Sequence, residues 1–388
     1  MVPQREIYLD NAATTRPGSS VVAAMVAALS EGYGNPSSIH GKGLAAEQVV
    51  SAARAQVAAA IGVPPAWVVF TSGGTEANNL AIKGAARAYS RRGRHLIGTA
   101  VEHSSVLETL RSLEADGFAL TLVPVDRRGR VDPAAVTAAL RPETVLLSVM
   151  AVNNEVGTIQ PVAEIAQAVS ARRGRGRLPL LHVDAVQAFG RVSIPTAQID
   201  LLTISAHKVH GPKGVGALIV REGVRIEPLL HGGDQQRALR PGTENVPGIV
   251  GFGEAAARIQ AGGEEGAAAL RSLRAHLADR LALIEGVSIN GPDQDDLAAP
   301  HILNVSLAGV RGETLVHRLE VDGIYVSTGS ACHSRDPRPS HVLLAMGLDR
   351  EAALSSVRIS LARSTTIEEI DDAADAIARA VGELRVLV

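Results

Sequence analysis

The chain has 388 residues, with 20% charged and 46% apolar residues, a formal net charge of −2 and 2% aromatic residues. This length predicts a large domain and a smaller one, while the near-neutral charge and scarce aromatics argue against direct nucleic-acid binding. No apolar run is long enough to span a bilayer, and the first residues lack the basic and apolar pattern of a secretory signal, so we expect a cytoplasmic protein with no membrane role.

Short β-rich runs alternate with helical stretches from about residue 67 to 220. This rhythm predicts an α/β domain around a mostly parallel sheet, in which ligands bind beyond the carboxyl ends of the strands. The expected strands are Trp67–Thr71, His95–Ala100, Leu120–Val125, Val145–Val152, Leu180–Asp184, Leu201–Ser205 and Gly216–Val220. The expected helices are Glu76–Tyr89, Ser105–Ala115 and Ala163–Arg173.

The composition changes after Pro247 to long tracts rich in Ala, Glu, Arg and Leu, which predict helices. Three strand-like runs and a final helix follow: His301–Leu307, Tyr325–Ser327, Val357–Leu361 and Ile367–Val388. These segments predict a smaller α+β domain, with a boundary near the pair Gly262 and Gly263. We expect residues 15–262 to form the large domain, and residues 1–14 and 263–388 to form the small one.

The segment Val69–Asn78 predicts a strand, a glycine turn and the start of a helix. Amides at a helix amino terminus, with hydroxyls beside them, can bind a phosphate. The segment lacks the lysine of a P-loop and the spacing of a dinucleotide fingerprint, which argues against a nucleotide. An ordinary turn between a strand and a helix is the alternative.

Two later segments place charged side chains at strand ends. Asp184 ends an apolar strand, where it either caps a helix or pairs with a protonated ring nitrogen. Lys208 follows another strand, where burial would lower its pKa and make its amine nucleophilic toward an aldehyde, although most lysines are only solvated charges. In chain order, the phosphate turn, Asp184 and Lys208 match the anion site, pyridinium partner and amine that pyridoxal phosphate needs.

The only cysteine, Cys332, cannot form an internal disulfide or a Cys-rich zinc site. It is therefore either a small buried residue or a reactive thiol. Its segment, Ser327–Pro339, is rich in Gly, Ser, Pro and charge, which favours a loop and a reactive thiol. His333, Arg335 and Arg338 could stabilise its thiolate.

Nearly the whole chain resembles the class V aminotransferase group, and within it the NifS/IscS-like cysteine desulfurases. The resemblance rests on an ordered set of segments: Tyr8–Thr15, Gly34–Ser38, the phosphate turn, Val101–His103, Asn153–Gly157, His182–Gln187, Thr203–Gly214, His231–Gly233, Gly242–Val246 and Gly329–Cys332. It implies pyridoxal-phosphate enzymes of fold type I: a large domain with a mostly parallel mixed sheet, a smaller α+β carboxyl-terminal domain carrying the Cys332 loop, and a homodimer.

The resemblance also implies roles for individual residues. Lys208, rather than Lys213, would bind the cofactor, His103 would stack on its ring and transfer protons, and Cys332 would accept sulfur from L-cysteine as a persulfide while alanine leaves. Arg358 and Asn154 would contact the substrate, and Arg358 would bind its carboxylate. The remaining cofactor contacts would come from Gly74, Thr75, Asn154, Asp184, Gln187, Ser205, His207 and, from the partner subunit, Thr243.

The chain departs from the family pattern at several positions. His333 stands where Thr or Ser usually follows the cysteine, and Gly232-Gly233-Asp234 replaces three glycines, which we interpret as a tolerated surface change. The chain lacks the longer tail with which some members dock an iron–sulfur scaffold. Such a scaffold, or another protein that accepts sulfur, is an expected partner.

Other functions fit parts of the pattern. An aminotransferase or selenocysteine lyase of the same group would make Cys332 incidental or selective for selenium. A sulfur-trafficking scaffold without catalysis would not need Lys208, Asp184 and Arg358 together. The sequence contains no His-Glu-x-x-His motif or comparable ligand cluster, so we expect no metal.

Overall fold

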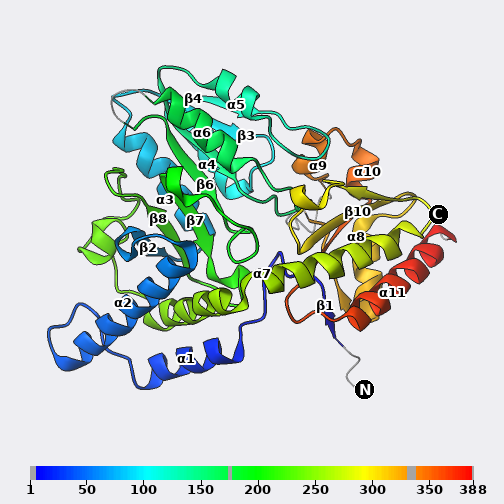
Figure 1. Ribbon diagram of the computed structural model, residues 1–388, viewed down its shortest axis with the longest axis horizontal. Coiled ribbons are helices and arrows are strands. Elements are labelled where there is room, and N and C mark those ends of the chain that lie inside the picture. Colours follow the sequence, from blue (N-terminus) through cyan, green and yellow to red (C-terminus); the bar gives the residue numbers. More distant parts are fainter. Residues whose placement is uncertain (1–5, 174–176, 330–337, 387–388) are drawn as a thin grey trace.

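The computed structural model describes residues 6–173, 177–329 and 338–386, apart from the side chains of 262–264. A large α/β part and a smaller α+β part lie side by side, and the long helix α7 (Val246–Ala282) runs beneath both (Figure 1). This architecture confirms the predicted fold class. No helix in these described ranges combines the length and apolarity that crossing a membrane requires.

The large part is built on a seven-stranded sheet with the strand order β2-β8-β7-β6-β5-β3-β4. All neighbouring strands are parallel except β8, which is antiparallel to both β7 and β2. The strands are β2 Val68–Thr71, β3 His95–Thr99, β4 Ala119–Val123, β5 Thr144–Met150, β6 Leu180–Asp184, β7 Leu201–Ser205 and β8 Gly216–Val220. The sheet is therefore mixed and mostly parallel, as the alternating pattern predicted.

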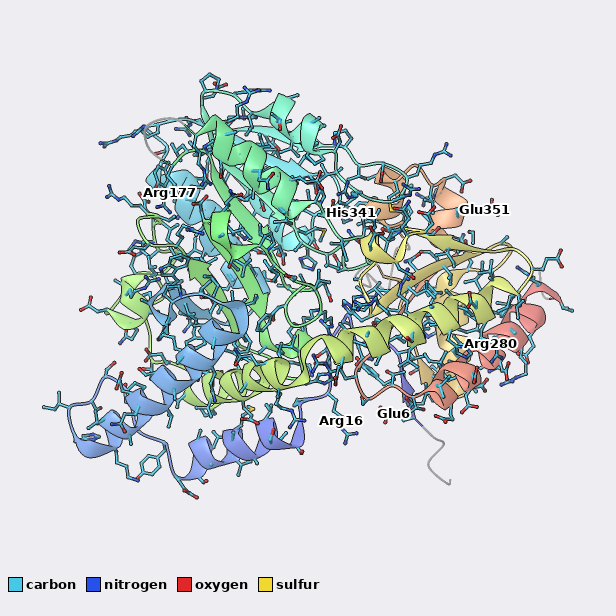
Figure 2. The ribbon with its side chains drawn as sticks, in the orientation of Figure 1. Glu6, Arg16, Arg177, Arg280, His341 and Glu351 are labelled. Carbon is cyan, nitrogen blue, oxygen red and sulfur yellow. The ribbon has the colours of Figure 1, made fainter. Side chains whose placement is uncertain are left out.

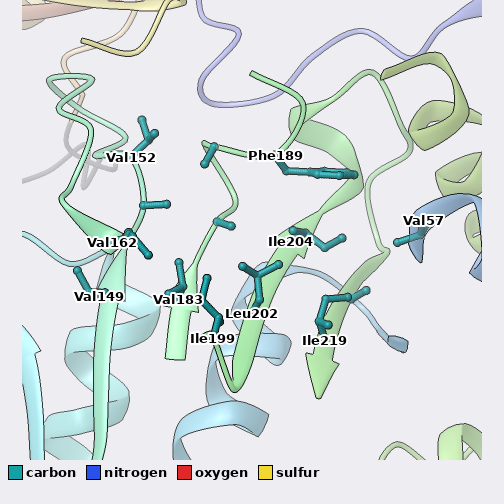
Figure 3. Close-up of a cluster of buried hydrophobic side chains, with 14 of the residues drawn as sticks. Val57, Val149, Val152, Val162, Val183, Phe189, Ile199, Leu202, Ile204 and Ile219 are labelled. Atoms are coloured by element: carbon teal, nitrogen blue, oxygen red, sulfur yellow. The ribbon is translucent and has the colours of Figure 1, made fainter. Parts of the chain in front are cut away.

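Both faces of this sheet are buried, because successive strand residues point to opposite sides. Leu146, Leu180 and Leu201 face one core, whereas their neighbours Leu147, Leu181 and Leu202 face the other. The second of these cores is shown in Figure 3, where Val183, Leu202 and Ile219 come from adjacent strands.

Helices cover each face of the large sheet. Helices α3 (Gly74–Ala88) and α4 (Ser104–Ala115) pack on one face, and residues of α2, α5, α6 and the start of α7 pack on the other. The remaining helices and 3-10 turns of the large part are α1 Ser19–Ser30, α2 Gly41–Ile61, η1 Pro65–Trp67, α5 Pro133–Ala139, α6 Val162–Arg172, η2 Thr196–Gln198, η3 Ala206–Lys208 and η4 Gln235–Ala238.

The small part has its own core between two short sheets and three helices. The antiparallel sheet β12-β10-β9 packs with α8, α11 and the second half of α7, and the amino-terminal strand β1 pairs with β11. The elements are β1 Ile7–Tyr8, β9 Val287–Asn290, η5 Asp295–Leu297, β10 Ile302–Leu307, α8 Gly312–Val321, β11 Ile324–Tyr325, α9 His341–Ala345, α10 Arg350–Leu354, β12 Ser356–Ser360 and α11 Ile367–Val386.

The predicted domain limits stay a prediction. The amino-terminal residues Ile7 and Leu9 lie in the small core, whereas Ala12 lies in the core of the large part. The pair Gly262 and Gly263 falls within α7 rather than in a linker. The chain therefore passes from one part to the other along a helix, and residues 9–15 cross between the two cores beside the carboxyl ends of the large sheet's strands.

Candidate active site

The turn after β2 lies against the segments that follow β6 and β7. A Cβ atom on Gly74 would lie 2.9 Å from Cγ2 of Val186 and 3.7 Å from Cβ of Ser205. Glycine is therefore required for this close packing. Helix α3 begins at Gly74 with Thr75 exposed beside it, so its free amides face the junction of three segments distant in sequence.

Ser205 and His207 add polar groups at this junction. Ser205 is 1% exposed, and its Oγ has no hydrogen-bond partner among the described residues. Burial, helped by the charges of Lys208 and Lys213, lowers the pKa of His207 to about 4, so its ring is neutral near pH 7. A buried hydroxyl in need of a partner, a neutral ring and helix amides suit a phosphate group, which accepts hydrogen bonds from all three.

Asp184 is held at the end of β6 by a network that reaches His103. Asn78 Nδ2 donates to Asp184 Oδ2 at 2.8 Å and to Ser105 Oγ at 2.9 Å, and Ser105 Oγ lies 2.8 Å from His103 Nδ1. The amide of Val186 donates to the other carboxylate oxygen at 3.0 Å. Asp184 is 5% exposed and has no cationic partner among the described ion pairs, as expected for a carboxylate that receives a protonated ring nitrogen.

Lys208 lies at the end of the 3-10 turn that follows β7. Its Nζ donates to the carbonyls of Ala12 and Ala13, both at 2.7 Å. Burial, together with the charges of Arg358 and Arg191, lowers its pKa to about 8. Lys213, in contrast, is exposed. Of the two lysines in this segment, Lys208 therefore has the environment that produces a nucleophilic amine.

Arg358 reaches the site from β12 of the small part and is 4% exposed. Its Nη2 pairs with Asp10 at 2.7 Å, and its Nη1 donates to the carbonyl of Asn154 at 3.0 Å. Arg358 therefore forms an ion pair within the chain. Nε is buried with no partner in the described part of the chain, so the guanidinium keeps a donor for a substrate carboxylate.

Gln187 joins the Lys208 region to the small part. Its Nε2 donates to the carbonyl of Ala12 at 2.9 Å, the same carbonyl that Lys208 contacts, and its Oε1 lies 3.3 Å from His301 Nε2. Burial lowers the pKa of His301 well below its usual value, so the neutral ring can donate through Nε2. This contact sets the orientation of the Gln187 amide.

The structure brings most of the predicted residues together, and their roles stay predictions. Gly74, Asp184, Gln187, Ser205, His207 and Lys208 converge at the strand ends, His103 joins them through Asn78, and Asn154 joins through Arg358. Thr243 is exposed and makes none of these contacts. Cys332 lies outside the described residues.

Sequence reasoning missed several residues that the structure places around the site. Asn78 links Asp184 to Ser105, and Asp10 pairs with Arg358. Glu102 is fully buried, burial raises its pKa to about 8, and its Oε1 accepts from Thr99 and the amide of Met150. A signal was available, because each is a polar side chain within one of the segments that carry the resemblance.

Known proteins share this fold and sequence along nearly the whole chain. The Aminotransferase class-V family profile matches residues 7–372. "Cysteine desulfurase IscS" of Methanosarcina thermophila is 44% identical over 98% of this chain and 93% of that relative, and the same-named protein of Dictyoglomus turgidum is 43% identical over 99% and 96%. A solved structure titled "NIFS-LIKE PROTEIN" has a TM-score of 0.91 and 40% identity, covering 98% of this chain and all of its own. The chain therefore belongs to the class V aminotransferase family, among its IscS-like and NifS-like cysteine desulfurases, which are pyridoxal-phosphate-dependent enzymes.

Proposed function

We propose that this protein converts L-cysteine to L-alanine and delivers the sulfur to Cys332 as a persulfide. One observation carries the proposal: the partly buried amine of Lys208, with a pKa of about 8, lies between a phosphate cradle, an unpaired Asp184 and a buried arginine. These groups match both ends of pyridoxal phosphate and the carboxylate of an amino acid.

Each part of the cofactor has residues suited to hold it. Gly74, Thr75, Ser205 and His207 would bind the phosphate, Asp184 the ring nitrogen, His103 the ring face, and Asn154 and Gln187 the phenolic oxygen. When bound, pyridoxal phosphate supplies an aldehyde carbon and an electron sink for the substrate's α-carbon.

The side chains of this chain would then position the substrate and move its proton. Arg358 would bind the carboxylate of L-cysteine, with Asn154 beside it, which sets the direction of the amino acid. The amine of Lys208 would take the α-proton, because its lowered pKa leaves much of it neutral near pH 8. His103 stands where a second proton transfer can occur.

Sulfur transfer conserves atoms and electrons within substrate and enzyme. The thiolate of Cys332 forms a bond to the substrate sulfur as the bond between that sulfur and the substrate's Cβ breaks. The carbon fragment gains protons and leaves as alanine, and Cys332 retains a persulfide. No external oxidant or reductant is needed, and the persulfide can pass to an iron–sulfur scaffold or another sulfur acceptor.

We also propose a homodimer in which each subunit supplies Thr243 to the other subunit's phosphate site. Thr243 is exposed, as a residue that contacts a partner subunit would be in a single chain. An apolar stripe on α1 supports an interface, because Val22, Val26 and Leu29 are 47%, 56% and 63% exposed at helical spacing. A cytoplasmic location stays a prediction.

The test is alanine release from L-cysteine, with a thiol reductant present, by the purified protein and its Cys332→Ala variant. We expect the wild type to form alanine and the variant to lose this activity while keeping the yellow colour of bound cofactor. Activity that persists in the variant would show that Cys332 is incidental, as in a selenocysteine lyase. If both proteins bind cofactor yet release no alanine, the proposed reaction is wrong and an aminotransferase becomes the better hypothesis.

A further inference from the structure

Glu155 is a buried carboxyl group whose position is set by its own backbone. It lies in the loop after β5 and is 4% exposed. Its amide donates to Asn153 Oδ1 at 2.9 Å, and its carbonyl accepts from Asn304 Nδ2 at 3.2 Å. Since a buried carboxyl is costly without a hydrogen-bond partner, the groups around its side chain show what it does.

On one side, the carboxyl holds the start of α9. Ser340 caps this helix, and its Oγ accepts from the amides of Val342 and Leu343 at 3.1 and 3.2 Å. These two amides occupy the oxygen's acceptor positions, so its single proton is directed to Glu155 Oε2, to which it donates. The neighbouring His341 donates to the carbonyl of Glu102 at 3.0 Å, which fastens the same helix start to the large part (Figure 2).

On the other side, the carboxyl lies close to Gly329, where an added side chain would meet it. A Cβ atom there would lie 3.5 Å from Glu155 Oε2 and 3.7 Å from Cβ of Arg358, and Gly329 has a φ of 82°. Gly329 and Ser340 flank residues 330–337, which lie outside the described part of the chain. The carboxyl group therefore forms a hydrogen bond with Ser340 after the segment that carries Cys332, and lies close to Gly329 before it.

We propose that Glu155 is a positioning residue for sulfur transfer, which holds the chain after the Cys332 segment through its hydrogen bond with Ser340, beside Gly329 at the start of that segment. Its link to catalysis rests on the proposed function, because the segment matters only if Cys332 accepts sulfur. Burial raises the pKa of Glu155, partly countered by the Ser340 hydrogen bond and the charges of His341 and Arg358. A carbonyl oxygen accepts the Ser340 proton whether the acid is ionised or neutral, so the hydrogen bond rather than the charge carries the effect.

The lone cysteine makes this proposal measurable without turnover, since a thiol reagent modifies only Cys332. The experiment measures the alkylation rate of Cys332 by iodoacetamide in the cofactor-loaded protein. We expect Glu155→Ala and Ser340→Ala each to raise this rate about tenfold, as loss of one hydrogen bond allows. The alkylation rate of the double variant should be no higher than that of either single variant, because both substitutions remove the same hydrogen bond. Glu155→Gln keeps the acceptor oxygen and should stay within about twofold of the wild type.

A matched control distinguishes loss of the hydrogen bond between Glu155 and Ser340 from general weakening of a short helix. Asp349 caps the neighbouring helix α10 through the amide of Ala352 and does not contact Glu155. Asp349→Ala should lose similar stability in urea yet leave the alkylation rate unchanged. In turnover, Glu155→Ala should lower kcat for alanine and change KM for cysteine much less.

Three results would contradict the proposed role of Glu155. These are a wild-type alkylation rate in Glu155→Ala, additive effects on this rate in the double variant, or equal effects on it of Glu155→Ala and Glu155→Gln. If Glu155→Ala does not fold, Ser340→Ala tests the same bond from the other side. Failure of the proposed function is distinguishable, because the wild type would then release no alanine whatever the alkylation rates.

Discussion

Opposing influences set the charge of Lys208. Burial and the charges of Arg358 and Arg191 favour its neutral amine, whereas Asp10 and Asp184 favour the ammonium form, with a resulting pKa of about 8. An amine that needs little alkali to lose its proton can attack an aldehyde near neutral pH. In the proposed mechanism the same residue later accepts a proton from the substrate, so one lowered pKa would serve both steps.

This pKa predicts how fast the protein freed of cofactor captures pyridoxal phosphate. Only the neutral amine attacks, so the rate should rise with pH through a midpoint near 8 and then level off. The amine of an ordinary lysine would continue to gain reactivity as the pH rises toward its usual pKa of 10.5. The measurement is the rate at which yellow absorbance appears at a series of pH values.

Variants of the two neighbouring lysines provide the controls for cofactor capture. Lys208→Ala should develop no such absorbance, whereas Lys213→Ala should keep the wild-type midpoint, because Lys213 is exposed. A wild-type midpoint near 10.5 would instead mean that the carbonyls of Ala12 and Ala13 stabilise the ammonium form more than burial opposes it.

Residues with a chemical reason to stand at a strand end could be predicted from the sequence. Asp184 and Lys208 each follow an apolar run, and the carboxyl ends of parallel strands meet at one edge. Asn78 and Glu155 could not be assigned in this way, because their roles depend on partners 106 and 185 residues away. A local pattern contains no information about which distant side chain a buried polar group will meet.

Among the elements, the edge strand β2 is completed by a side chain rather than by another strand. Gln236 is 6% exposed, and its Oε1 accepts from the amide of Phe70 at 2.9 Å and from Arg54 at 3.1 Å. Gln236, Arg237 and Ala238 all have positive φ angles of 48°, 61° and 58°, which cost energy in residues other than glycine. The hydrogen bonds of Gln236 offset that strain and hold this turn against the strand that leads to the phosphate cradle.

Gln236→Ala should therefore lower the free energy of unfolding by about 1–3 kcal/mol, because the buried amide of Phe70 loses its acceptor. Urea unfolding measures this loss. Gln198→Ala is the matched control: Gln198 is exposed, and its variant should stay within about 0.5 kcal/mol of wild type. Equal stability of the two variants would show that water replaces the Gln236 contact.

The elements themselves followed the sequence pattern closely except at α7. The predicted strands β6, β7 and β8 have the observed limits, because apolar runs bounded by turn residues mark strands buried on both faces. We predicted a domain boundary near Gly262 and Gly263, where glycine would weaken a helix, and this boundary stays a prediction. Helix α7 continues there, with Phe252 packed in the large core and Leu270 and Leu277 in the small one. Packing at both ends of the helix overrides the local preference in its middle.

In the whole molecule, the site depends on a fixed position of the small part relative to the large part. Arg358 comes from the small part, and its partners Asp10 and Asn154 belong to the crossing segment and the large part. In the small part, Arg280 of α7 pairs with Asp371 and Asp375 of α11, where Figure 2 shows these helices side by side. Helix α7 thus has contacts in both parts, which helps to keep Arg358 at a defined distance from the strand ends.

One exposed apolar surface, on α1, is not covered by any of the residues that the structure describes. On α1, Val21 and Ala28 pack inward, whereas Val22, Val26 and Leu29 form an outward apolar stripe that Tyr33, 69% exposed, continues beyond the helix. A surface helix needs only one apolar face, so a second face indicates contact with another molecule. Thr243 is exposed as well, and its proposed place in a partner's phosphate site makes a second copy of the chain the proposed occupant.

Leu29→Glu should therefore convert the proposed dimer to monomer, because it places a charge within an apolar contact. Losing one buried leucine weakens association by about 3 kcal/mol, or roughly a hundredfold in Kd. Sedimentation velocity measures the mass, and Val321→Glu is the matched control, since Val321 is 69% exposed on α8 of the small part. If Thr243 completes the partner's phosphate site, Leu29→Glu should also bind pyridoxal phosphate more weakly than Val321→Glu at equal stability. A Leu29→Glu protein that remains dimeric would place the interface elsewhere, and a monomer that keeps full cofactor affinity would remove Thr243 from the phosphate site.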